Sequence, residues 1–137
     1  MPVGAAYVFS NSAGTTSWTQ LIKLLASDAS SYDEFGGSVA IYENIIIVGA
    51  PYHLNKGITL IILSISVSCL TFLEGSVYVF SQIENSNTWS QTTMLVASNG
   101  RVDDTYGCSV SIYRNAVSIG ALGVEINNSV DQDFGIK

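Results

Sequence analysis

The clearest pattern in the chain is a short alternating segment followed by an almost wholly apolar one. Residues 38–42 alternate in character, and residues 45–48 read Ile-Ile-Ile-Val. Alternation is typical of a half-buried strand, and a short β-branched run is typical of a buried one. Glu43 and Asn44 form a turn between the two segments. We therefore predict a β-hairpin over residues 38–48.

The same pattern returns 71 residues further along the chain, as the pair Trp18 and Trp89 illustrates. A Tyr-Val-Phe triplet also recurs at this shift, beginning at Tyr7 and at Tyr78. Chance does not align two tryptophans, two aromatic triplets and two Gly-Ala pairs without a gap. The chain therefore contains two copies of one unit. The equivalent segments are residues 4–50 and 75–121.

Two further strands are predicted before the hairpin of each copy. In the first copy they cover residues 4–10 and 17–25, and a polar loop separates them. Strict alternation in the second strand places its side chains Trp18, Gln20, Ile22 and Leu24 on one face. The abundance of Tyr, Ser, Thr, Val and Ile agrees with a β-structure.

The residues that flank the hairpins resemble the FG-GAP repeat, the unit of integrin-type β-propellers. The residues that carry this resemblance are Phe35, Gly36, Gly49, Ala50 and Pro51 in the first copy and Tyr106, Gly107, Gly120 and Ala121 in the second. Leu122 stands where the family has proline, so the second copy departs from the pattern at that position.

The resemblance implies an all-β fold that is a fragment of a β-propeller. In that family a blade is a four-stranded antiparallel sheet, with the hairpin as its two inner strands. Residues 38–96 would then form one complete blade, flanked by two half-blades over residues 4–25 and 109–121. Half-blades leave open sheet edges, so we expect other blades of a longer chain as partners, or poor stability, or oligomerisation.

The aromatic residues of the outer strands are predicted to pack between blades rather than to form a ligand platform. We expect equivalent side chains of the two copies to lie in like environments. The residues concerned are Tyr7, Phe9 and Trp18 in the first copy and Tyr78, Phe80 and Trp89 in the second.

An uncharged apolar segment, residues 58–73, interrupts the repeat. Without it and its flank the second copy would follow at about 53 residues, near a usual blade length. One interpretation is a retained intron or another gene-model artefact, because excision between Gly57 and Gly75 restores the motif. A second is a protruding apolar hairpin. A third is a membrane helix, although about 24 Å of helix is shorter than the roughly 30 Å hydrocarbon core.

Charge and composition exclude several kinds of protein. The formal net charge is −6 at pH 7, and the 5 basic residues do not cluster, so we expect no nucleic-acid partner. Neither Cys69 nor Cys108 has zinc-site or disulfide-framework spacing. The chain begins inside a repeat strand without a signal-peptide pattern, so we expect a fragment of a longer protein. Residues 122–137 read as an irregular tail.

Four aspartates are the candidates for an ion site. Asp28 and Asp33 precede Phe35-Gly36, and Asp103 and Asp104 precede Tyr106-Gly107. The alternative is turn chemistry, in which Asp side chains accept backbone hydrogen bonds. Some members of the family hold calcium in Asp-x-Asp-x-Asp-Gly-x-x-Asp loops, but that motif is absent, so we expect no metal and no cofactor.

No residues suggest catalysis. His53, the sole histidine, has no partner expected of a general base or a zinc site. We therefore expect a non-enzymatic interaction or adhesion module that binds a protein or glycan through blade loops. The loops in question follow the two hairpins, at residues 52–57 and 122–128.

The alternative is an accessory propeller domain of a larger hydrolase, which the resemblance also allows. The resemblance implies an extracellular or cell-surface setting, and the Asn127-Asn128-Ser129 glycosylation sequon agrees with export. We do not expect these residues to enter a membrane.

Overall fold

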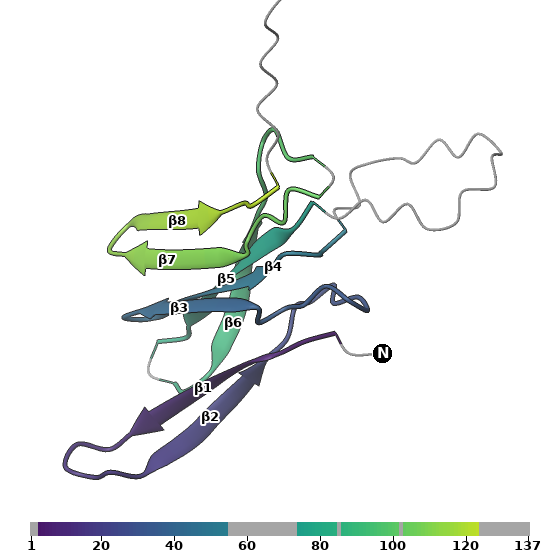
Figure 1. The fold of residues 1–137 in the computed structure, drawn as a ribbon. Coiled ribbons are helices and arrows are strands. Elements are labelled where there is room, and N and C mark those ends of the chain that lie inside the picture. Colours follow the sequence, from purple (N-terminus) through teal and green to yellow (C-terminus); the bar gives the residue numbers. More distant parts are fainter. Residues whose placement is uncertain (1–2, 55–73, 85, 102, 124–137) are drawn as a thin grey trace, which may run out of the picture.

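The protein is all-β, as predicted. The structure, a computed structural model, describes residues 3–54, 74–84, 86–101 and 103–123, and every regular element in them is a strand (Figure 1). The strands are β1 (Ala6–Asn11), β2 (Trp18–Leu24), β3 (Ser38–Tyr42), β4 (Ile45–Ala50), β5 (Ser76–Gln82), β6 (Trp89–Leu95), β7 (Ser109–Tyr113) and β8 (Ala116–Gly120).

The strands form three antiparallel sheets. The central sheet has the order β3-β4-β5-β6, and β1-β2 and β7-β8 are two-stranded sheets. In Figure 1 the β1-β2 pair lies on one side of the central sheet, and β7 lies along β3 on the other. The prediction of one complete blade flanked by two half-blades is confirmed.

The predicted hairpin is the pair β3-β4. Tyr42 pairs with Ile45 across a two-residue turn, in which Glu43 has a φ of 51°. Ile47 and Val48 in β4 are fully buried, one on each face of the strand. Their burial explains the uninterrupted β-branched run, because a strand covered on both faces has no polar side.

Both copies fold through the same turn. The amide of Gly36 donates to the carbonyl of Gly49 (3.0 Å), and the amide of Gly107 donates to the carbonyl of Gly120 (2.9 Å). These bonds connect the Phe/Tyr-Gly pair to the end of the hairpin. Gly36 and Gly107 have positive φ angles of 95° and 93°, in a region of backbone conformation that favours glycine.

A second close approach joins the blade to the next half-blade. A Cβ atom on Gly49 would lie only 2.1 Å from the carbonyl oxygen of Gly107, so the two backbones can touch only at a glycine. The hydroxyl of Ser38 donates to the same carbonyl (2.6 Å). Tyr42 and Tyr113 extend this junction with an edge-to-face ring contact at 5.6 Å.

The hydrophobic core lies between the β1-β2 half-blade and the facing side of the central blade. Its members come from β1, β2, β4, β5, β6 and the connection before β3. They include Leu24, Ala26, Phe35, Ile46, Val48, Tyr78 and Phe80. Phe35 touches the rings of both Tyr78 and Phe80 edge-on, with centroids 5.4 and 6.1 Å away. The core is therefore an inter-blade core.

The prediction that equivalent aromatic residues share like environments is wrong. Tyr78 and Trp89 are 0% and 8% exposed, whereas Tyr7 and Trp18 are 53% and 65% exposed. Phe80 and Phe9 differ in the same way, at 3% and 50%. The second copy's strands belong to a complete blade that is covered by the first half-blade. No described residue covers the outer face of β1-β2.

The predicted strict alternation from Trp18 to Leu24 is also wrong. Val8 pairs with Ile22 and Phe9 with Gln20, so Leu21 is an extra residue in β2. Such a β-bulge moves the residues on either side of it to opposite faces. Ile22 and Leu24 therefore face the core, while Trp18 is exposed.

The apolar segment 58–73, with its three interpretations, lies outside the described residues, as do the sequon and the tail from residue 124 onward. Within the described part of the chain, no helix is long and apolar enough to span a bilayer.

Candidate functional site

A buried polar cluster lies beneath the loop that follows β4. His53 is 2% exposed, and its Nδ1 lies 2.9 Å from Oδ2 of Asp33, which is 3% exposed. Its Nε2 lies 3.5 Å from Oδ2 of Asp28. Because an ionised carboxylate only accepts hydrogen bonds, Nδ1 carries the proton in the contact with Asp33.

The backbone fixes each member of this cluster. Asp33 Oδ2 also accepts the amide of Ser30 (2.8 Å), which holds the carboxylate within its own turn. The amide of His53 donates to the carbonyl of Ala50, and the carbonyl of His53 accepts from Gly75. His53 therefore connects the end of β4 to the start of β5 from inside the blade.

Tyr78 completes the cluster from β5. Its hydroxyl donates to Oδ1 of Asp28 (2.9 Å), and its ring meets that of His53 edge-on at 5.8 Å. Burial, the hydrogen bond to Asp28 and the negative charges of Asp28 and Asp33 raise the pKa of the Tyr78 hydroxyl well above 10. The hydroxyl is therefore a persistent donor at physiological pH.

The four candidate ion-binding aspartates do not form one site, although Asp28 and Asp33 both contact His53. Asp33 and Asp104 are buried in equivalent turns, where each carboxylate accepts a backbone amide, from Ser30 and Arg101 respectively. Asp103 is exposed and has a φ of 67°. Among the described residues no group of three or more His, Cys, Asp or Glu side chains could hold a metal ion.

The loops that follow the two hairpins begin on the same side of the blades, opposite the hairpin turns (Figure 1). Equivalent bonds hold their first residues. Tyr52 donates its amide to the carbonyl of Asp33 (3.3 Å), and Gly123 donates to that of Asp104 (3.2 Å). Tyr52, Leu54 and Leu122 nonetheless leave 37%, 41% and 84% of their surface exposed.

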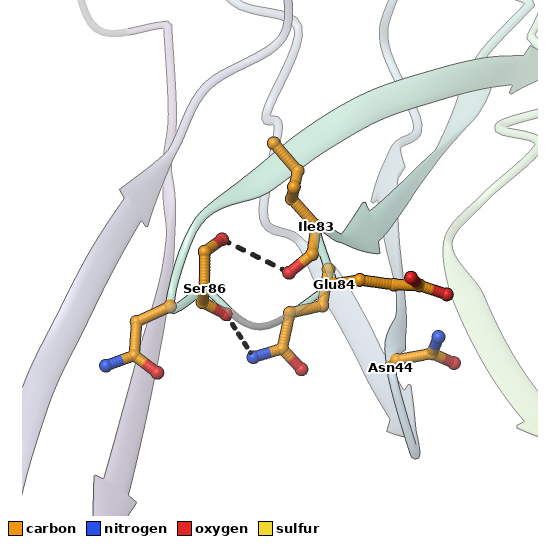
Figure 2. Close-up of a pocket in the computed structure, with 6 residues that line it drawn as sticks. Asn44, Ile83, Glu84 and Ser86 are labelled. Atoms are coloured by element: carbon orange, nitrogen blue, oxygen red, sulfur yellow. Dashed lines mark hydrogen bonds between the residues drawn. The ribbon is translucent and has the colours of Figure 1, made fainter.

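A polar cleft of about 390 Å³ lies at the opposite end of the blade, between the β3-β4 turn and the β5-β6 loop (Figure 2). Asn44, Ile83 and Glu84 line it. Gln82 Nε2 donates to the carbonyl of Ser86, and the hydroxyl of Ser86 donates to that of Ile83. These local bonds hold the β5-β6 loop in a compact turn.

Comparison with known families decides the identity of the fold. The model of the FG-GAP repeat matches residues 18–59 and again residues 89–133, so both matches begin at a tryptophan strand. The chain belongs to the FG-GAP repeat family. A search of curated proteins found no significant match.

The FG-GAP motif residues have a structural role in this chain. Phe35 is 2% exposed in the inter-blade core, and Gly36 and Gly49 are joined by a backbone hydrogen bond. Pro51 has no amide hydrogen, whereas Leu122, which replaces it in the second copy, donates its amide to Thr105 Oγ1 (3.3 Å). The departure at Leu122 is therefore accommodated by one extra hydrogen bond.

The sequence offered His53 no cysteine, serine or second histidine as a partner, and the structure pairs it with two aspartates instead. Asp33 lies 20 residues earlier in the chain, and Asp28 lies in the same connection before β3. Asp28 also accepts a hydrogen bond from Tyr78 in β5. No local spacing joins such residues, so motif searching could not find them. One signal was present: the second copy has Asn99 and Val124 where the first has Asp28 and His53, so the cluster is specific to the first FG-GAP copy.

Tyr78 predicts a loss of stability at alkaline pH. Because its pKa is higher in the folded than in the unfolded protein, its contribution is complete below about pH 10 and is lost as pH rises further. We expect the free energy of unfolding to fall by up to about 1.4 kcal/mol per pH unit in that range. Urea titrations between pH 8 and 11.5 measure this slope.

Tyr78→Phe should reduce the alkaline slope, because the buried ionisable hydroxyl is gone. Tyr113→Phe is the matched control, since Tyr113 is 62% exposed and Tyr78 stays in place. Equal slopes for the two variants would contradict a role for Tyr78.

Proposed function

We propose that this chain is a non-enzymatic interaction module that binds a protein or glycan through the loops after β4 and β8. The observation that carries the proposal is the pairing of rigid loop bases with exposed apolar side chains. Tyr52 and Leu122 begin equivalent loops on one side of the blades, and 37% and 84% of their surfaces are exposed. Loops held by a rigid scaffold are where binding residues concentrate.

The buried cluster supports this role. His53 lies between exposed Tyr52 and exposed Leu54, and its bond to Asp33 ties this loop to the turn before β3. A loop fixed in this way loses little conformational entropy when it binds a partner. We propose an integrin-like, extracellular or cell-surface setting for these blades.

The test is binding of the full chain to an array of glycans and to a panel of purified extracellular proteins. Truncation of a hot-spot residue, often an aromatic one at the centre of an interface, weakens binding by about 2 kcal/mol or more. We therefore expect Tyr52→Ala with Leu122→Ser to weaken binding at least about tenfold.

Ile83→Ser is the matched control, because Ile83 is 50% exposed at the opposite end of the blade, beside the polar cleft. If Ile83→Ser weakened binding and the loop variant did not, the binding site would lie in the cleft, and the proposal would be overturned. The absence of any ligand that discriminates between these variants would overturn it as well.

A further inference from the structure

The side of the central blade that faces β1-β2 has a seat that no described residue fills. The seat is a groove of about 320 Å³ between the free edge of β1 and the face of β3 and β4. Ala6, Val8, Val39, Ile41 and Ile46 line it. Val39 and Ile41 are 58% and 59% exposed, although they belong to the inner hairpin of a complete blade.

The equivalent seat, one blade further on, is filled by β3-β4. There β4 pairs with β5, the equivalent of β1, in the register Ile45↔Ser81 to Ala50↔Ser76. The same hairpin lies against β7, the equivalent of β3. Val110 and Ile112, the equivalents of Val39 and Ile41, are consequently only partly exposed. The seat is therefore shaped for an inner FG-GAP hairpin.

The chain also carries one inner hairpin whose outer edge is free. Among the described residues β8 pairs only with β7, whereas its equivalent β4 pairs on both sides. The face that would enter the seat carries the small residues Ser109, Ser111 and Ser118, with the large side chain of Tyr113 at the hairpin turn. The free edges of β8 and β1 are thus equivalent to the two strand edges that pair in the β4-β5 junction.

We propose that the β7-β8 hairpin of one copy of this chain fills the seat of a second copy, with β8 pairing antiparallel to β1. The β4-β5 register, moved to the equivalent residues, places Ala116 opposite Ser10 and Ser118 opposite Val8. The pairing adds the two half-blades together into a complete four-stranded blade. Main-chain hydrogen bonds supply the affinity, as in other strand additions.

The contact is head-to-tail, because it uses two different surfaces of each copy. Such an interface closes into a ring or grows into a filament.

A disulfide test reads out the register. In a Cys69→Ser, Cys108→Ser background, Ser10→Cys protein is mixed with Ala116→Cys protein under mild oxidation. Both positions are exposed, so neither substitution disturbs the core. Directly opposed residues lie within disulfide range, whereas residues two positions out of register do not. We expect the Ser10→Cys and Ala116→Cys mixture to cross-link at least about tenfold more than a Ser10→Cys and Ser118→Cys mixture.

Sedimentation velocity across micromolar concentrations tests the seat itself. The unaltered chain should associate, and Ile41→Lys should weaken association at least about tenfold because it places a charge in the apolar seat. Ile83→Lys, at a position that is 50% exposed and does not line the groove, should leave association unchanged.

Three results would overturn the proposal. The first is a chain that stays monomeric at every concentration. The second is equal association of the Ile41→Lys and Ile83→Lys proteins. The third is equal cross-linking of the in-register and out-of-register mixtures.

Discussion

Replacing Phe35 by Ala is expected to lower the free energy of unfolding by about 3–5 kcal/mol. Phe35 is 2% exposed and lies between the β1-β2 half-blade and the central blade. Its ring contacts Tyr78 and Phe80 edge-on, which adds to the burial of its own surface. Truncation removes these contacts and opens a cavity at the junction between the two sheets.

The repeat supplies the control for this substitution. Tyr106 is the equivalent residue in the second copy, but it is only partly buried, because no complete blade follows it among the described residues. Tyr106→Ala should therefore lose less than half as much stability as Phe35→Ala. Urea unfolding followed by tryptophan fluorescence measures both values. Equal losses would show that the inter-blade core contributes no more than the half-covered site.

The strands and their order were predictable from the sequence because they depend on short-range patterns. The alternation over residues 38–42 and the β-branched run of β4 are local, and the shift of 71 residues supplied the equivalent strands. The motif glycines were also identified from the sequence, and the structure gives the reason for them. Gly36 and Gly107 need a positive φ, and Gly49 needs to approach Gly107, so a side chain is excluded for a geometric reason.

Burial was not predictable, because it depends on what lies beside each copy. Tyr7 and Tyr78 are the same residue in the same motif, yet one is 53% exposed and the other 0%. The sequence of a repeat describes the unit, whereas exposure is decided by the neighbouring sheet. The bulge at Leu21 was missed for a related reason, since it is a feature of the β1-β2 pairing rather than of β2 alone.

The polar cluster was not predictable either, because its members come from three segments. Asp33 was identified as a turn residue or an ion ligand, and His53 was interpreted as a lone loop histidine without a cysteine, serine or second histidine beside it. The structure brings them to 2.9 Å, although neither lies near the other in sequence. Only the antiparallel return of β4 places His53, two residues after Pro51, beside the turn that precedes β3.

The second large effect is expected for Asp33→Ala, which should lower the free energy of unfolding by about 2–6 kcal/mol. The carboxylate is 3% exposed and accepts two hydrogen bonds, from the Ser30 amide and from His53 Nδ1. Its removal leaves both donors without that acceptor inside the protein. Each buried donor that loses its partner costs about 1–3 kcal/mol.

Asp104→Ala separates the two contributions of Asp33. Asp104 is 4% exposed in the equivalent turn, and its carboxylate accepts the Arg101 amide at 2.7 Å, but the second copy has Val124 where the first has His53. The amount by which Asp33→Ala exceeds Asp104→Ala therefore measures the bond to His53, and we expect about 1–3 kcal/mol. Losses of equal size would mean that Asp33 acts only within its turn, and that the loop carrying Tyr52 is not held by the buried cluster.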